Sequence, residues 1–96
     1  MVQGDTTSAF AIALAAFHRK IPVLHLEAGL RTYDLDHPYP EEFNRQAISR
    51  LAAYNLCPTA RAYSHVECER TPGKRFVVGN TVLDNLVDIE PTFTNK

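Results

Sequence analysis

The chain is organised around two short stretches, Gln3-Gly4-Asp5-Thr6-Thr7 and His25-Leu26-Glu27-Ala28-Gly29-Leu30-Arg31-Thr32. Each has the pattern of a buried strand that runs into a turn, and each places a carboxylate there, Asp5 in the first and Glu27 in the second. The segment between them has the length of one βαβ crossover, and ligands of open parallel sheets bind beyond the carboxyl ends of the strands. If the two strands are neighbours, Asp5 and Glu27 lie within roughly 5 to 10 Å of each other.

A helix is predicted from about Thr6 to His18, with Asp5, Thr6 or Thr7 as its N-cap. The segment carries two apolar faces, one of large side chains and one of alanines. Because a helix that is apolar on most sides is typically buried on most sides, we expect this helix to be largely enclosed. The large side chains are Phe10, Leu14 and Phe17, and the alanines are Ala9, Ala13 and Ala16.

The rest of the chain alternates between strand and helix patterns. Pro22 is expected to open the second strand, where a missing N–H is tolerated. We predict strands at 21–26, 53–57 and 75–78, a loop at 30–40, and helices at 40–51, 59–70 and 81–88. This order indicates an α/β fold, a Rossmann-like parallel sheet with flanking helices and right-handed crossovers. The predicted domains are a partial Rossmann-like domain at 1–89 and a frayed tail at 90–96.

Length and composition exclude several classes of protein. Ninety-six residues form one domain or less, which is short for a doubly wound sheet. A net charge of −1 and a pI near 6.4 leave no basic patch for nucleic acid, and no apolar run approaches the roughly 18 residues of a membrane helix. The start lacks a signal-peptide pattern, and we expect Cys57 and Cys68 to be free thiols of a cytoplasmic protein. The short first strand suggests a truncated version of a longer protein.

Three carboxylates each have a structural and a functional interpretation. Asp5 is either a helix cap or a functional carboxylate. Glu27 follows an apolar strand and needs a partner if it is buried, for which Arg31 is the expected cation. Glu41 stands where an acidic residue favours the helix dipole, and Arg45 lies four residues further on. The patterns alone leave capping, an ion pair and the helix dipole open beside catalysis.

Other polar residues give less information about which reaction the site could carry out. His25 lies on the second strand, either in the core or lining the crevice, and Glu42 forms a simple i, i+4 pair with Gln46. The chain has no Gly-rich phosphate loop and no GxSxG elbow. Three carboxylates near one crevice suit proton transfer at a carbon, or glycosyl chemistry with an acid and a base on opposite faces of the sugar.

Four motifs follow one another along the chain: Gly4-Asp5-Thr6-Thr7, the stretch from His25 to Thr32, Pro40-Glu41-Glu42-Phe43-Asn44-Arg45, and Gly79-Asn80-Thr81-Val82-Leu83-Asp84. In order and spacing they closely resemble the non-hydrolysing UDP-N-acetylglucosamine 2-epimerases. The resemblance implies a GT-B fold, in which a nucleotide-sugar lies between two Rossmann-like domains. This chain resembles the later part of the first domain, an incomplete N-terminal half of that fold.

The resemblance implies a reaction that needs no redox or metal cofactor. Anti elimination of UDP from UDP-N-acetylglucosamine gives 2-acetamidoglucal, and re-addition of UDP after protonation of C2 from the other face gives UDP-N-acetylmannosamine. The family's acid/base carboxylates fall on Asp5, Glu27 and Glu41. The full-length protein is expected to be a homodimer whose C-terminal domain is needed for binding UDP. Substrate contacts are implied for His25, Arg31 and Arg45.

Two positions depart from the family pattern. Gln3 stands where histidine is frequent, and Leu24 stands where glycine is frequent. Gln3 is expected to change the hydrogen bonding beside Asp5. Because the family's catalytic histidine and most of its UDP contacts lie in later sequence, we expect the isolated chain to be inactive. An exposed sheet edge is also expected to promote self-association.

Two other functions stay open at this point. One is a GT-B glycosyltransferase half-domain, whose carboxylates would serve transfer to an acceptor. The other is a non-catalytic Rossmann-like binding module. Exchange of the C2 proton in heavy water separates the epimerase from the transferase, and titration with a UDP-sugar tests the third interpretation.

Overall fold

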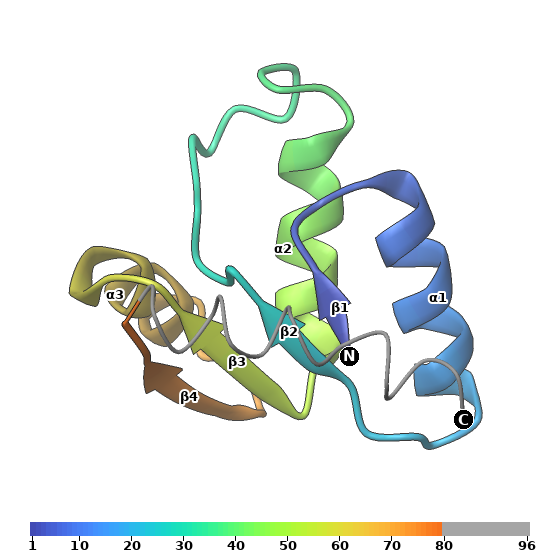
Figure 1. Cartoon of the computed structure of the whole chain (residues 1–96). Coiled ribbons are helices and arrows are strands. Elements are labelled where there is room, and N and C mark those ends of the chain that lie inside the picture. Colours follow the sequence, from blue (N-terminus) through green and yellow to red (C-terminus); the bar gives the residue numbers. More distant parts are fainter. Residues whose placement is uncertain (80–96) are drawn as a thin grey trace.

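A four-stranded parallel sheet with helices between its strands forms the body of the protein (Figure 1). The computed structural model describes residues 1–79. The strands follow the order β1-β2-β3-β4, so each strand pairs with its neighbours in the sequence. The elements are β1 (Val2–Gln3), α1 (Thr7–His18), β2 (Leu24–Leu26), α2 (Glu41–Leu51), β3 (Tyr54–Cys57), α3 (Ala60–Cys68) and β4 (Lys74–Val77). The predicted α/β class and its parallel sheet are confirmed.

The register of the sheet places the carboxyl ends of β1, β2 and β3 next to one another. Gln3 pairs with Leu26, and Leu26 pairs with Leu56. The ladder continues one step beyond the strands, because the Gly4 amide donates to the Leu26 carbonyl at 3.2 Å and the Ala28 amide donates to the Leu56 carbonyl at 3.0 Å. The turns that carry Asp5 and Glu27 therefore leave the sheet side by side.

Helix α1 begins with a side-chain cap from Thr6, whose Oγ1 accepts a hydrogen bond from the Ala9 amide at 3.0 Å. Of the three predicted caps, Thr6 is the one observed. The expectation that this helix is enclosed on most sides is wrong, because the described part of the chain covers only its alanine face. Ala13 has no exposed surface, whereas Phe17 is 52% exposed. The small side chains let α1 approach the sheet and α2 closely. Phe10 packs partly against this core, whereas Leu14 and Phe17 are exposed.

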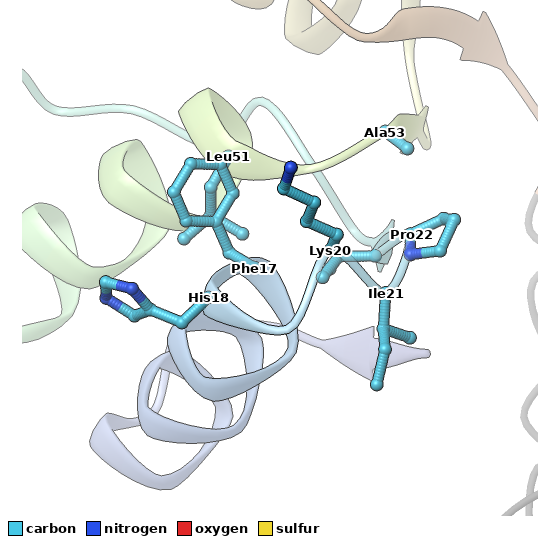
Figure 2. A pocket seen from close by; sticks show the side chains of 8 residues that line it. Phe17, His18, Lys20, Ile21, Pro22, Leu51 and Ala53 are labelled. Atoms are coloured by element: carbon cyan, nitrogen blue, oxygen red, sulfur yellow. The ribbon is translucent and has the colours of Figure 1, made fainter.

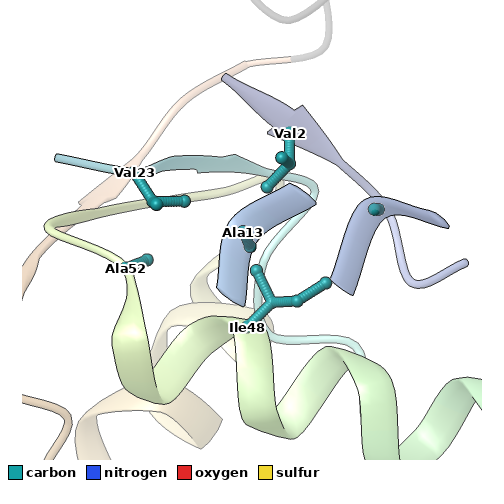
Figure 3. Close-up of a cluster of buried hydrophobic side chains, with 6 residues drawn as sticks. Val2, Ala13, Val23, Ile48 and Ala52 are labelled. Atoms are coloured by element: carbon teal, nitrogen blue, oxygen red, sulfur yellow. The ribbon is translucent and has the colours of Figure 1, made fainter. Parts of the chain in front are cut away.

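Two clusters of buried apolar side chains lie on the helical side of the sheet. The first fills the space between β1, α1 and α2 and is shown in Figure 3. The second lies beneath α3. The first consists of Val2, Ala9, Ala13, Val23, Ile48 and Ala52, and the second of Ala28, Cys57, Ala62 and Val66.

Several predicted boundaries need correction. The second strand begins at Leu24 and not at residue 21, because Lys20 adopts a left-handed conformation (φ 59°) that ends α1 and turns the chain back towards the sheet. Pro22 therefore precedes the strand. Helix α3 stops at Cys68, and β4 spans Lys74–Val77. The predicted helix at 81–88, the tail at 90–96 and the domain boundary at 89 lie outside the described residues.

None of the helices in residues 1–79 has the length and apolar character required to cross a bilayer.

Candidate active site

The turn after β1 is held in place from two sides. His25 on β2 donates from Nε2 to the Gly4 carbonyl at 2.9 Å. Asn44 on α2 donates from Nδ2 to the Asp5 carbonyl at 3.1 Å and contacts Thr7 Oγ1 at 3.3 Å. Gly4 adopts a left-handed conformation with φ at 77°, which glycine tolerates without steric cost. The backbone at Asp5 is therefore fixed by both the sheet and α2.

Among residues 1–79, the Asp5 carboxylate pairs with one cation, and it remains partly exposed. Arg45 donates from Nη1 to Asp5 Oδ2 at 3.4 Å, and the Asp5 side chain is 29% exposed. The same guanidinium donates from Nε to Glu42 at 2.7 Å. The predicted i, i+4 pair between Glu41 and Arg45 is wrong, because Arg45 bridges Asp5 and Glu42 instead.

Glu27 occupies a strained position at the end of β2. Its φ is 59°, a left-handed conformation that costs a non-glycine residue about 1–2 kcal/mol and that tends to occur at functional sites. Its carboxylate accepts a hydrogen bond from Gln3 Nε2 at 2.6 Å. The expected ion pair with Arg31 is therefore wrong. Gln3 was expected to change the hydrogen bonding beside Asp5, but its side chain bonds to Glu27 instead. Glu27 is left half-buried, with a neutral partner.

Arg31 anchors the start of the loop at 30–40 to Glu69, the residue that follows α3. Its Nε and Nη2 donate to the two carboxylate oxygens of Glu69 at 2.7 and 3.0 Å, and its side chain has no exposed surface. Tyr33 donates its hydroxyl to the same carboxylate at 2.8 Å. Burial and this bond to Glu69 raise the pKa of Tyr33 to about 12. Burial raises the pKa of Glu69, but the bonds from Arg31 and Tyr33 outweigh it, so that this pKa lies below its usual value. The guanidinium is enclosed by Glu69 and the Leu30 carbonyl, and the predicted substrate contact of Arg31 stays a prediction.

His25 supports the turn from below. It is completely buried, and its ring donates from Nε2 because the Gly4 carbonyl can only accept. Nδ1 lies 3.3 Å from Ser49 Oγ and from Asn55 Oδ1. Burial lowers the pKa of His25, although the bonds to Gly4 and Asn55 act in the opposite direction. The ring has no exposed surface and supports the Gly4 turn, and its predicted substrate contact stays a prediction.

Glu41 and Glu42 open α2 with opposite environments. Glu41 is half-buried, and no described residue pairs with its carboxylate. Glu42 has no exposed surface and accepts hydrogen bonds from the Thr32 amide at 3.1 Å and the Tyr33 amide at 2.9 Å. The sequence shows the Glu-Glu pair but not this difference, since only the packing of the loop decides which of the two is buried.

A cavity lies at the opposite ends of the strands, away from the carboxylates. It has a volume of about 490 Å³ and is bordered by the end of α1, the segment before β2 and the segment before β3 (Figure 2). Its lining is mainly apolar and contains no carboxylate. The carboxylates at the strand ends thus form a separate site. The lining residues are Phe17, His18, Lys20, Ile21, Pro22, Val23, Leu51 and Ala53.

Comparison with known proteins identifies the family. The family model described as UDP-N-acetylglucosamine 2-epimerase matches residues 1–96. The chain belongs to the UDP-N-acetylglucosamine 2-epimerase family. It is 49% identical over 88 residues to the UDP-N-acetylglucosamine 2-epimerase of Neisseria meningitidis and 50% identical over 88 residues to that of Salmonella typhimurium. Both alignments cover 91% of this chain, but only 24% and 23% of the respective relatives.

Solved structures of this epimerase family confirm the fold. The crystal structure of UDP-GlcNAc 2-epimerase from N. meningitidis bound to UDP-GlcNAc matches 97% of this chain with a TM-score of 0.81 and 47% identity. The UDP-GlcNAc 2-epimerase from Methanocaldococcus jannaschii, in complex with UDP-GlcNAc and UDP, matches 91% with a TM-score of 0.78 and 42% identity. The chain covers 26% and 24% of these two proteins. It therefore has the fold of part of a Rossmann-like domain of a GT-B epimerase and spans about a quarter of the length of its relatives.

Proposed function

We propose that this chain supplies the acid/base carboxylates of an enzyme that interconverts UDP-N-acetylglucosamine and UDP-N-acetylmannosamine. One observation carries the proposal: Asp5 and Glu27 stand beyond the carboxyl ends of two neighbouring parallel strands, where such sheets bind ligands. Glu41 begins the helix whose Asn44 and Arg45 hold the Asp5 turn. The membership of the chain in the epimerase family supports this assignment.

The proposed reaction breaks and reforms two bonds. The C2–H bond loses its proton to a carboxylate while the C1–O bond breaks, and its electron pair leaves with UDP. The C1–C2 bond becomes the double bond of 2-acetamidoglucal. Protonation of C2 from the opposite face and return of a UDP oxygen to C1 then complete the epimerisation, so that no electrons are gained or lost overall. An acid and a base on opposite faces of the sugar meet this requirement, and Asp5, Glu27 and Glu41 are the candidates.

The environments of the three carboxylates fit this division of work. Asp5 is held by Arg45 and its side chain is partly exposed, so a substrate can reach it, and we assign it as the base. Glu27 is held by Gln3 at the end of the neighbouring strand, and we assign it as the acid on the other face of the sugar. Glu41 is half-buried and has no partner among the described residues, so it is available to a substrate.

A chimaera with the Neisseria relative tests the proposal. The matched 88 residues of that protein are replaced by the corresponding residues of this chain. We expect the chimaera to form UDP-N-acetylmannosamine and to incorporate deuterium at C2 in heavy water. Asp5→Asn, Glu27→Gln and Glu41→Gln should each lower kcat by about 100-fold or more, whereas Glu67→Gln, on the exposed side of α3, should stay within about twofold.

The alternatives have distinct outcomes in the same assay. A folded chimaera that binds UDP-N-acetylglucosamine but shows no deuterium exchange would contradict the proposal. Acceptor-dependent release of UDP without exchange would indicate a transferase. Full activity in all three carboxylate variants would show that these residues do not move the proton.

We also expect the isolated 96-residue chain to leave UDP-N-acetylglucosamine unchanged. The curated relatives are about four times as long, and the resemblance places the catalytic histidine and most UDP contacts in sequence that does not align with this chain. Chromatography of the nucleotide-sugars after incubation with purified protein checks this prediction. The appearance of UDP-N-acetylmannosamine above the level of a Glu27→Gln control would contradict it.

A further inference from the structure

Glu42 accepts hydrogen bonds from more residues than any other carboxylate among the described residues, and the proposed reaction does not use it. It follows Glu41 directly, and successive helical residues point about 100° apart. Glu41 therefore stays half-buried at the start of α2, while Glu42 turns inward and loses all contact with solvent. A completely buried carboxylate stays ionised only when nearby positive charge and hydrogen bonds compensate for its lost hydration.

Every partner of Glu42 is a hydrogen-bond donor. Oε1 accepts from the Thr32 amide at 3.1 Å and from Arg45 Nε at 2.7 Å. Oε2 accepts from the Tyr33 amide at 2.9 Å and from Gln46 Nε2 at 2.8 Å. Burial raises the pKa of this carboxyl, but the hydrogen bonds outweigh it and hold the pKa at about 2. A glutamine at this position would turn a donor towards donors, so the site requires the ionised carboxylate.

The donors connect Glu42 to two parts of the candidate site. Through Thr32 and Tyr33 it holds the loop that leads from Glu27 back to α2. Through Arg45 it orients the guanidinium that reaches Asp5 Oδ2 at 3.4 Å. We propose that Glu42 is a positioning residue, which sets the orientation of Asp5 through Arg45 without touching the substrate itself. Its role in catalysis rests on the proposed function of Asp5.

Hydrogen exchange on the intact 96-residue chain, followed by mass spectrometry of its peptides, tests the geometric part alone. In Glu42→Gln we expect the peptides that cover 30–36 and 4–8 both to exchange about tenfold faster. The charged hydrogen bonds of Glu42 to the loop amides and to Arg45 are lost in this variant. In Arg45→Met we expect faster exchange at 4–8 only, because Glu42 still holds the loop amides. Glu67→Gln should change neither segment.

Three results of this experiment would overturn the proposal. Faster exchange at 30–36 alone in Glu42→Gln would show that Glu42 fastens the loop without acting on Asp5. Equal acceleration throughout the chain, including β4, would show a general loss of stability. Unchanged exchange at 4–8 in Arg45→Met would show that Arg45 does not link Glu42 to Asp5. Arg45→Met keeps Glu42 and its loop contacts, so it also serves as the test if Glu42→Gln fails to fold.

Kinetics in the Neisseria chimaera test the catalytic part. We expect Glu42→Gln to lower kcat by about 100-fold with KM changed less than threefold, because a displaced base affects the chemical step more than binding. A loss confined to KM, or unchanged kcat together with a loosened segment 4–8, would overturn the catalytic role of Glu42. Inactivity of the unmutated chimaera would instead count against the proposed function, and the exchange experiment would still decide whether Glu42 positions Asp5.

Discussion

At the scale of single residues, His25 makes the free energy of unfolding depend on pH in the mildly acidic range. Burial lowers its pKa in the folded chain, whereas an unfolded histidine titrates near 6.5. The unfolded state therefore binds more protons below about pH 6.5, and the free energy of unfolding falls as the pH is lowered through that value. Urea unfolding at pH 7.5 and 5.5 should show this loss.

Variants separate His25 from other titrating groups. His25→Gln should reduce the loss of stability between pH 7.5 and 5.5, although the variant is less stable at both values. His18→Gln, at the exposed end of α1, should leave the loss unchanged. A wild-type midpoint that does not move between the two pH values would refute this assignment.

Gly29 is required where the loop leaves β2. Its φ is 96°, and a Cβ added there would lie 2.2 Å from the Ala62 carbonyl oxygen, a backbone atom of α3. Gly29→Ala should destabilise the chain by about 3 kcal/mol, which combines left-handed strain with overpacking. Gly4→Ala is the matched control, because Gly4 also has a positive φ but open space around it, and it should cost only about 1 kcal/mol. Equal shifts in the urea midpoints of the two variants would contradict the clash.

Partner choice is the part of the site that local sequence rules predict least well. The i, i+4 rule pairs Glu27 with Arg31 and Glu41 with Arg45. The folded chain pairs Arg31 with Glu69, which is 38 residues away. Spacing along one element compares only residues of that element, whereas Arg31 lies in a loop and its carboxylate partner directly follows α3. The carboxylate positions were predictable from the strand ends, but their partners depend on tertiary packing.

At the scale of elements, α1 packs by its small side chains. Ala13 has no exposed surface, while Ile12 beside it is 62% exposed. Ala13→Leu should therefore destabilise the chain by about 1–3 kcal/mol, because the added methylenes push α1 away from α2 and the sheet. Ile12→Ala should change stability by about 0.5 kcal/mol or less. Chemical denaturation checks both, and a neutral Ala13→Leu would mean that α1 packs loosely.

The sequence predicts the order of the elements well and their ends less well. Each buried strand and each apolar helix segment up to β4 is present where the pattern indicates. The start of β2 differs, because the backbone of Lys20 turns left-handed and Val23 contributes its carbonyl to the Ala53 and Tyr54 amides before regular pairing begins. Such details depend on how the neighbouring strand approaches, which hydrophobic periodicity does not encode.

At the scale of the whole molecule, the sheet presents an edge at β1. Among the described strands, β1 pairs with β2 alone. The Gly4 amide points to Leu26, and successive amides of a strand point in opposite directions, so the Gln3 amide points away from β2. An unpaired edge of this kind favours pairing with a second chain. The isolated chain should therefore form oligomers whose amount rises with protein concentration.

A proline at residue 3 tests whether that edge is responsible. Gln3→Pro removes the outward N–H, and proline is tolerated on edge strands, so self-association should weaken. Gln3→Ala keeps the N–H but also loses the side-chain bond to Glu27, so it serves as the control and should associate like the wild type. Analytical ultracentrifugation over a concentration series measures the difference. If both variants associate equally, the contact lies elsewhere, and the exposed apolar side chains of α1, Ile12 and Phe17, become the surface to mutate. A wild-type chain that stays monomeric at all concentrations and unfolds cooperatively would refute the prediction altogether.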